Sequence, residues 1–137
     1  HAPKVRLPGT AGLADMGSIG KKLYYWNPRH SPLSMVEKAD FISAAGYLDG
    51  GGAREFLGLK GGPQLVISNL AVMDFHPGRK KMRLKSVHPG IGVEEVQEAT
   101  GFEWLLPGDS IAETRPPTQE QVRLIREVID PDYMRKK

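Results

Sequence analysis

Residues 65–75 read Leu65-Val66-Ile67-Ser68-Asn69-Leu70-Ala71-Val72-Met73-Asp74-Phe75 and are apolar at nearly every position. A continuous apolar run of this kind is typical of a strand that is covered on both faces of a sheet. After the turn at 76–79, residues 82–87 alternate strictly between apolar and polar side chains, the pattern of a strand with one wet face. The two runs together predict a hairpin with a basic outer surface.

Shorter elements are predicted around this hairpin. A capping-box pattern at 118–121 marks the start of a helix with one apolar side, and Gly101 is placed to end an earlier helix. The predicted strands are 4–7, 22–26 and a buried strand at 39–43, and the predicted helices are 13–19, 93–100 and 118–129. These elements favour the α/β class, with an open sheet covered by helices in one domain.

The composition excludes several kinds of site. There is no cysteine among the 137 residues, so disulfides, thiolate metal sites and thiol nucleophiles are excluded. No two histidines have metal-binding spacing, and Asp74 and His76 fit a turn better than a chelate, so no metal site is predicted. No apolar run reaches the roughly 18 residues that span a bilayer. We therefore expect a cytoplasmic protein without a membrane segment.

The basic residues raise the question of a negatively charged partner. The formal net charge is +3. The basic residues gather mainly at Arg79, Lys80, Lys81, Arg83 and Lys85 and again at Arg135, Lys136 and Lys137. No aromatic residues that could stack on bases are interleaved with them, so nucleic-acid binding is not predicted. A solvated surface is the main interpretation, and a site for a phosphate-rich ligand is the alternative.

A glycine-spaced turn, Pro8-Gly9-Thr10-Ala11-Gly12-Leu13-Ala14-Asp15, falls between the predicted strand at 4–7 and a helix of small residues. In this position successive free N–H groups can hold an oxyanion or a phosphate. The alternative is that Gly9 and Gly12 simply allow positive φ and tight packing.

A second glycine-rich segment covers 46–54 and continues at 58–63. Long loops inside compact domains are usually functional or mobile. A loop that faces a ligand and a plain flexible connection both remain open on the residues alone.

These segments occur together, in the same order, in one known family. The matching stretches are 4–9 with Gly12, 36–42, 46–51, 66–75 and 87–102, and the last runs from His88-Pro89-Gly90 to Thr100-Gly101-Phe102. The chain resembles the C-terminal half of the second (B or β) subunit of family I CoA-transferases, most closely the glutaconate CoA-transferase type. The resemblance implies the NagB/RpiA/CoA-transferase-like fold, with residues 1–137 forming the C-terminal part of one domain.

The resemblance also implies an activity. Members of this family move CoA from an acyl-CoA to a free carboxylic acid through a glutamyl-CoA thioester on the enzyme. Their nucleophilic glutamate belongs to the N-terminal part of the B subunit, which is absent from this chain. The implied partners are that N-terminal part and an A subunit in a hetero-oligomer. The implied substrates are an acyl-CoA and a carboxylate, with no permanently bound cofactor.

The resemblance suggests roles for individual residues. In the similar succinyl-CoA:3-ketoacid transferases the turn reads Gly-Met-Gly-Gly-Ala-Met-Asp, and its third glycine donates a backbone N–H to the oxyanion. Aligned with that turn, Gly12 takes this role, while Ala11 and Leu13 depart from the pattern. The residues expected to bind substrate or CoA are Gly9, Gly46, Tyr47, Gly50, Gly51 and Arg54. For Arg54, a substrate carboxylate or a CoA phosphate is the expected partner, with a surface salt bridge as the alternative.

Three other functions remain open at this point. Proteins that resemble this family include ring-cleaving acyl-CoA hydrolases and a decarboxylase. Because a fold does not fix a reaction, both activities remain alternatives. A non-catalytic module that binds a partner subunit or a CoA-like ligand is the other alternative.

Overall fold

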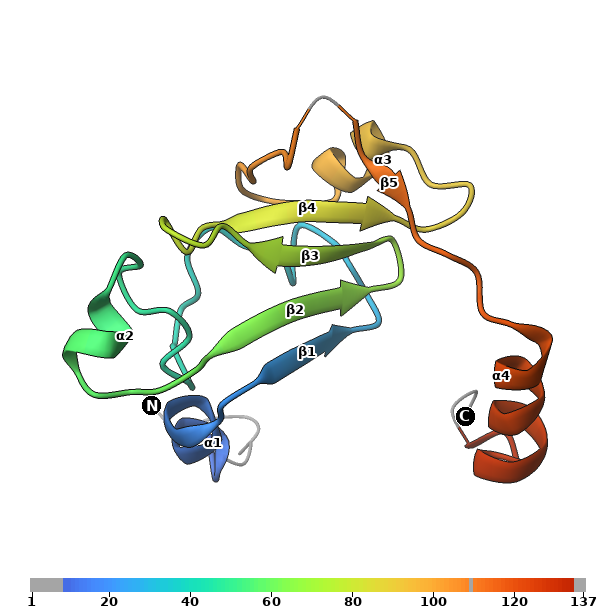
Figure 1. Cartoon of the computed structure of the whole chain (residues 1–137), viewed down its shortest axis with the longest axis horizontal. Helices are drawn as coiled ribbons and strands as arrows, with labels where there is room; N and C mark the ends of the chain where they lie inside the picture. The colour runs from blue at the N-terminus through green and yellow to red at the C-terminus, as the bar shows by residue number, and fades with distance from the viewer. Residues whose placement is uncertain (1–8, 109, 135–137) are drawn as a thin grey trace, which may run out of the picture.

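The computed structural model describes residues 9–108 and 110–134 and is built on a mixed five-stranded sheet (Figure 1). β1 pairs parallel with β2, β2 to β4 are antiparallel neighbours, and β5 lies parallel to β4. The strands are β1 (Leu23–Asn27), β2 (Pro63–Ser68), β3 (Ala71–Phe75), β4 (Met82–Val87) and β5 (Ala112–Glu113). The predicted open sheet with helices is confirmed.

The apolar run at 65–75 forms parts of two strands and not the single strand predicted. The Ser68 hydroxyl oxygen accepts hydrogen bonds from the N–H groups of Leu70 and Ala71, both at 3.1 Å. Such a serine turn offers the backbone an alternative to the sheet ladder, and here it reverses the chain between β2 and β3. Because apolar residues flank the turn on both sides, the sequence pattern does not indicate it.

The predicted hairpin is confirmed between β3 and β4, and β4 has the predicted bounds. Asp74 of β3 lies directly opposite Arg83 of β4. The Arg83 guanidinium donates two hydrogen bonds of 2.8 Å to the Asp74 carboxylate. This bidentate ion pair fixes the register of the two strands on their polar face.

The helices are short. They are α1 (Leu13–Ile19), α2 (Ala53–Phe56), α3 (Val93–Glu98), α4 (Gln119–Arg123) and a π-helical continuation η1 (Leu124–Ile129). α1 has the predicted bounds, α3 lies inside the predicted range, and α2 was not expected. Gly101 lies two residues beyond the C-cap of α3, which is Ala99, and its N–H donates to the Met35 carbonyl oxygen at 2.7 Å.

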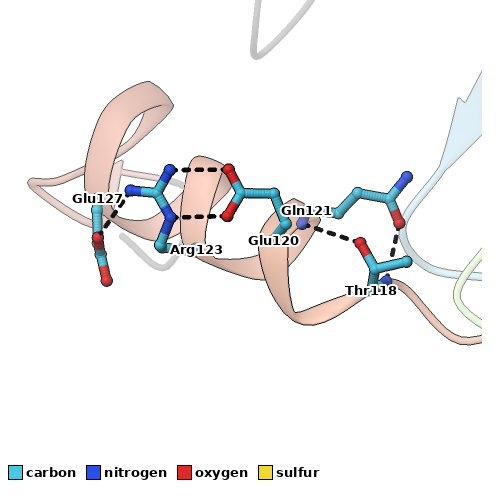
Figure 2. Close-up of polar contacts among 5 residues, drawn as sticks. All are labelled: Thr118, Glu120, Gln121, Arg123 and Glu127. Atoms are coloured by element: carbon cyan, nitrogen blue, oxygen red, sulfur yellow. Dashed lines mark hydrogen bonds and ion pairs between the residues drawn. The ribbon is translucent and has the colours of Figure 1, made fainter.

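α4 begins at the predicted capping box (Figure 2). The Gln121 N–H donates to the Thr118 hydroxyl at 3.2 Å, and the Gln121 side chain accepts from the Thr118 N–H at 2.9 Å. Arg123 forms ion pairs with Glu120 and Glu127 on the polar side. The apolar side is not buried, because α4 and η1 stand away from the sheet (Figure 1).

The predicted buried strand at 39–43 is wrong. Phe41 and Ile42 are 72% and 76% exposed, and no strand forms there. A strand needs a hydrogen-bonded neighbour, and the described part of the chain supplies none beside this segment. The predicted strand at 4–7 and the basic residues 135–137 lie outside the described residues.

The core lies between the sheet and α3. Its buried apolar residues are Met35, Val66, Leu70, Ala71, Met73, Leu84, Val87 and Val96. Leu84 of β4 and Val96 of α3 are completely buried. The alternation in β4 and the helical spacing in α3 thus direct one face of each element into the same core.

A buried histidine joins three segments beside this core. The His30 backbone N–H donates to the Asn69 side-chain oxygen at 2.8 Å. The His30 ring contacts the Ser68 hydroxyl through Nδ1 at 2.8 Å and the Thr100 hydroxyl through Nε2 at 2.9 Å. The Thr100 hydroxyl donates to the Val96 carbonyl oxygen, so the Nε2–H tautomer fits this network best. Burial lowers the pKa of His30.

We expect His30 to make stability depend on pH. The unfolded chain binds a proton at His30 near the ordinary pKa of about 6.5, whereas the folded chain resists protonation until a lower pH. The free energy of unfolding therefore falls as the pH is lowered through about 6.5, by at most about 1.4 kcal/mol per pH unit from this residue. Urea unfolding of wild type and His30→Asn between about pH 5.5 and pH 7.5 measures this slope. An equal slope in both proteins would contradict the assignment.

Candidate functional site

The crossover between β1 and β2 forms a surface cavity with α1. The cavity has a volume of about 590 Å³ and is lined by Ala14 and Ser18 of α1 and by residues 42–49. Parallel strands require a long crossover, and here it carries α2 and the predicted glycine-rich loop. α1, α2 and the turn between β3 and β4 all lie at the same end of the sheet (Figure 1).

The predicted glycine turn precedes α1 at the edge of this cavity. The Leu13 N–H donates to the Thr10 carbonyl oxygen at 3.0 Å, and Ala11 adopts a positive φ of 46°. Ala11, which departs from the glycine of similar turns, thus keeps a left-handed conformation that glycine adopts more easily. Gly9 is exposed beside it.

Gly12 is the N-cap of α1, with a φ of −74°. Its carbonyl oxygen accepts from the Met16 N–H at 2.9 Å. Its own N–H has no acceptor within residues 9–108 and 110–134, and a Cβ placed on Gly12 meets nothing within 4 Å. Among the described residues the Gly12 amide is therefore an unused hydrogen-bond donor, two residues from Ala14, which lines the cavity.

Arg54 lies behind the cavity wall with 1% of its surface exposed. Its Nη1 donates to the carbonyl oxygens of Gly17 at 2.9 Å and Gly46 at 2.7 Å. Its Nη2 donates to the Ser18 carbonyl at 3.2 Å, and its Nε donates to the Gly61 carbonyl at 3.2 Å. One guanidinium thereby ties the last turn of α1 to both ends of the glycine-rich segment.

Tyr47 anchors the loop from the cavity side. Its hydroxyl donates to the Pro63 carbonyl oxygen at 2.5 Å, and its ring packs edge-on against Phe75 with the centroids 5.0 Å apart. Burial raises the pKa of the Tyr47 hydroxyl, and the positive charge of Arg54 partly opposes this effect. The side chain is therefore a neutral, fixed part of the cavity wall.

Gly50 and Gly51 have positive φ values of 81° and 53°. A Cβ on Gly50 would lie 2.7 Å from the Arg79 carbonyl oxygen, so only glycine fits where the loop meets the turn between β3 and β4. Gly62, with a φ of 131°, leaves a similar close approach to Arg54 and Tyr47. Gly62 thus allows the backbone to pass close to these two side chains.

The structure brings some of the predicted site residues together. Gly46 and Tyr47 line the cavity, and Gly50 lies against the β3–β4 turn at the Arg79 carbonyl oxygen. Gly9, Gly12 and Gly51 are not among the residues that line the cavity. Arg54 lies behind the wall, with its guanidinium bonded to backbone carbonyls, so a contact between Arg54 and substrate stays a prediction. Ala14 and Ser18 also line the cavity, and neither was predicted to do so, since small helical residues carry no distinctive signal.

Two kinds of site are not found among residues 9–108 and 110–134. No group of three or more histidine, aspartate or glutamate side chains is arranged to hold a metal ion. No helix in this part of the chain has both the length and the apolar character needed to cross a membrane.

The amino-acid sequence is similar to known enzyme subunits, although no family model matches it. It is 34% identical over 133 residues to the B subunit of glutaconate CoA-transferase from Acidaminococcus fermentans, and the match covers 96% of this chain and 48% of that protein. The chain is homologous to CoA-transferase B subunits. The B subunit of 3-oxoadipate CoA-transferase from Pseudomonas knackmussii is also 34% identical, over 92% of this chain and 48% of its own length.

A hydrolase is about equally similar to this chain. The cholesterol ring-cleaving hydrolase IpdB subunit of Rhodococcus jostii is 35% identical over 97% of the chain and 51% of that protein. The chain thus spans about half the length of the curated relatives it matches.

Solved structures agree with this homology. Glutaconate CoA-transferase of Acidaminococcus fermentans superposes with a TM-score of 0.82 at 31% identity, over 98% of this chain and 51% of that one. IpdAB of Rhodococcus jostii gives 0.80 at 30% identity, over 98% and 53%. The decarboxylase AibA/AibB, at 23% identity and a TM-score of 0.70 over 98% and 49%, shows the shared fold alone.

Proposed function

We propose that this chain is the C-terminal part of a CoA-transferase B subunit that transfers CoA between an acyl-CoA and a carboxylic acid. The 34% identity to the glutaconate CoA-transferase of Acidaminococcus fermentans over 96% of the chain carries this proposal. In the proposed reaction CoA moves from the acyl group to the carboxylate of an enzyme glutamate. This gives a glutamyl-CoA thioester and releases the acyl group as the free acid. A second carboxylic acid then takes the CoA and restores the glutamate.

The proposed catalytic site needs more than this chain. The nucleophilic glutamate is assigned to the remaining part of the B subunit, and an A subunit completes a hetero-oligomer. The relatives are themselves named as one kind of subunit within a larger enzyme, which supports a partner subunit here. A CoA thioester is the proposed substrate, and no permanently bound cofactor is proposed.

Within this chain we assign the oxyanion to the Gly12 amide, which has no acceptor of its own among the described residues. Gly9, Gly46, Tyr47, Gly50 and Gly51 would form the walls that receive the thioester. Arg54 would act chiefly as a positioning residue, because its hydrogen bond to the Gly46 carbonyl oxygen holds the cavity wall against α1. Direct binding of a substrate carboxylate or phosphate by Arg54 remains part of the same prediction.

Hydrolytic ring cleavage of an acyl-CoA is the second candidate function. The 35% identity to the Rhodococcus jostii hydrolase favours it almost as strongly. The two functions differ in the bond that is broken. A transferase breaks the thioester and moves CoA to a second carboxylic acid, whereas a ring-cleaving hydrolase adds water across a bond of a ring in its substrate.

Intact-mass measurement of the assembled complex tests the proposed function. We expect incubation with an acyl-CoA, without an acceptor acid, to add one CoA to a B-subunit glutamate through a thioester. Added carboxylic acid should remove this CoA and yield a new acyl-CoA. A complex in which the B-subunit glutamate is replaced by glutamine is the matched control.

Two results would argue against transfer. Addition of one water to a cyclic acyl-CoA with opening of its ring, without an acceptor acid, would favour the hydrolase. Binding of CoA without adduct or turnover would favour a non-catalytic module.

A further inference from the structure

We propose that Arg79 and Lys80, in the turn between β3 and β4, bind the phosphate groups of the CoA thioester. This inference deepens the proposed function and rests on it. It assigns a ligand to the basic residues of the hairpin, for which a solvated surface is the simpler interpretation.

The turn at 76–81 is held by hydrogen bonds. The His76 N–H donates to the Lys81 carbonyl oxygen, and the Lys80 N–H donates to the His76 carbonyl oxygen, both at 2.8 Å. His76 Nδ1 accepts from the N–H groups of Gly78 at 3.2 Å and Arg79 at 3.1 Å. The backbone that carries the two cations is therefore ordered by its own bonds, which lowers the entropy lost when a ligand binds.

The turn also contacts the wall of the cavity. Lys80 Nζ lies 5.2 Å from the centre of the Tyr47 ring, and Tyr47 lines the cavity. The Arg79 carbonyl oxygen approaches Gly50 so closely that no side chain fits there. If the thioester of a ligand lies in the cavity, Arg79 and Lys80 are therefore next to the cavity wall that contacts it.

The charges of Arg79 and Lys80 favour binding of an anion. Neither Arg79 nor Lys80 forms an ion pair with any residue in the described parts of the chain, whereas the neighbouring Arg83 is neutralised by Asp74. Of the residues that line the cavity, one, Asp49, carries a carboxylate. Phosphate groups are strong acceptors for arginine and lysine, and CoA carries several of them.

Lys81 provides a matched control on the same turn. It lines a different cavity, of about 770 Å³, together with Glu37 and Glu103. Lys81→Gln removes the same charge as Lys80→Gln at the next residue, but beside carboxylates and away from the Tyr47 wall. It should leave phosphate binding nearly unchanged.

The test compares two thioesters in the assembled complex. One is an acyl-CoA, and the other is the same acyl group on pantetheine, which lacks the nucleotide phosphates. For Arg79→Gln/Lys80→Gln we expect kcat/KM with acyl-CoA to fall about 10-fold or more, mainly through KM. The value with acyl-pantetheine should stay at that of wild type. Arg79→Lys/Lys80→Arg, which keeps both charges, should recover most of the acyl-CoA activity.

Equal losses with both thioesters, or no loss with either, would overturn the inference. Calorimetric binding of CoA and of pantetheine makes the same comparison without turnover. Suppose that the wild-type complex binds CoA more tightly than pantetheine, that the double variant does not, and that no CoA is transferred. This result would reject the proposed function but support the phosphate site. A wild-type complex without any preference for CoA would reject the phosphate site even if transfer occurs.

Discussion

Replacing Arg54 with methionine is expected to lower the free energy of unfolding by about 3–5 kcal/mol. Methionine keeps much of the apolar stem but leaves the carbonyl groups of Gly17, Ser18, Gly46 and Gly61 without their donor. A buried acceptor without a partner costs about 1–3 kcal/mol, and some of these carbonyls regain water when the loop relaxes. Urea unfolding of the complete B subunit with its partner measures the change.

Two further variants separate hydrogen bonding from charge. Arg54→Lys keeps the positive charge, but its single ammonium group cannot span four carbonyls, so an intermediate loss is expected. Arg126→Met makes the same chemical change at an exposed position of η1 and should alter stability by less than about 0.5 kcal/mol. If Arg54→Met were as stable as Arg126→Met, the guanidinium would not hold the loop.

The role of Arg54 also shows where sequence reasoning stops. Its acceptors lie as far as 37 residues away in the chain, and no local pattern announces such a contact. The expectation that Arg54 pairs with a substrate carboxylate or a CoA phosphate followed from the resemblance to CoA-transferases, and it stays a prediction. In the structure Arg54 hydrogen-bonds backbone carbonyls, and Gly62 lets the backbone approach its side chain closely.

Elements with a local cause were predictable. The capping box fixed the start of α4, and strict alternation fixed β4 within its bounds. The predicted single strand at 65–75 was wrong because one hydroxyl, that of Ser68, makes the turn inside an apolar run. The predicted strand at 39–43 was wrong for a different reason, since apolar composition cannot show whether a neighbouring strand is present.

The candidate site was predictable in part. The resemblance to CoA-transferases singled out the glycine turn and Gly46 and Tyr47, and the cavity brings Gly46 and Tyr47 together with α1. The fold achieves this through the β1–β2 crossover, a long-range feature that residue patterns do not encode. The contact between Lys80 and Tyr47 was equally invisible, because it joins two loops far apart in the sequence.

Removal of the Gly12 amide hydrogen is expected to lower kcat about 100- to 1,000-fold with little change in KM. An oxyanion donor acts mainly in the transition state, and losing one typically has an effect of this size. Gly12→Pro removes the N–H while its φ of −74° already suits proline. The Gly12 carbonyl oxygen, which accepts from Met16, is kept.

The neighbouring residue requires a matched background for this test. Ala11 has a positive φ of 46°, and a following proline restricts the preceding backbone. Both variants should therefore be made with Ala11→Gly, which tolerates this conformation. In that background Gly12→Ala keeps the amide, and its Cβ meets nothing within 4 Å, so its kcat should match that of Ala11→Gly alone. If Gly12→Pro stayed active while CoA binding was unchanged, or Gly12→Ala lost as much rate as Gly12→Pro, the Gly12 amide would not be the oxyanion donor.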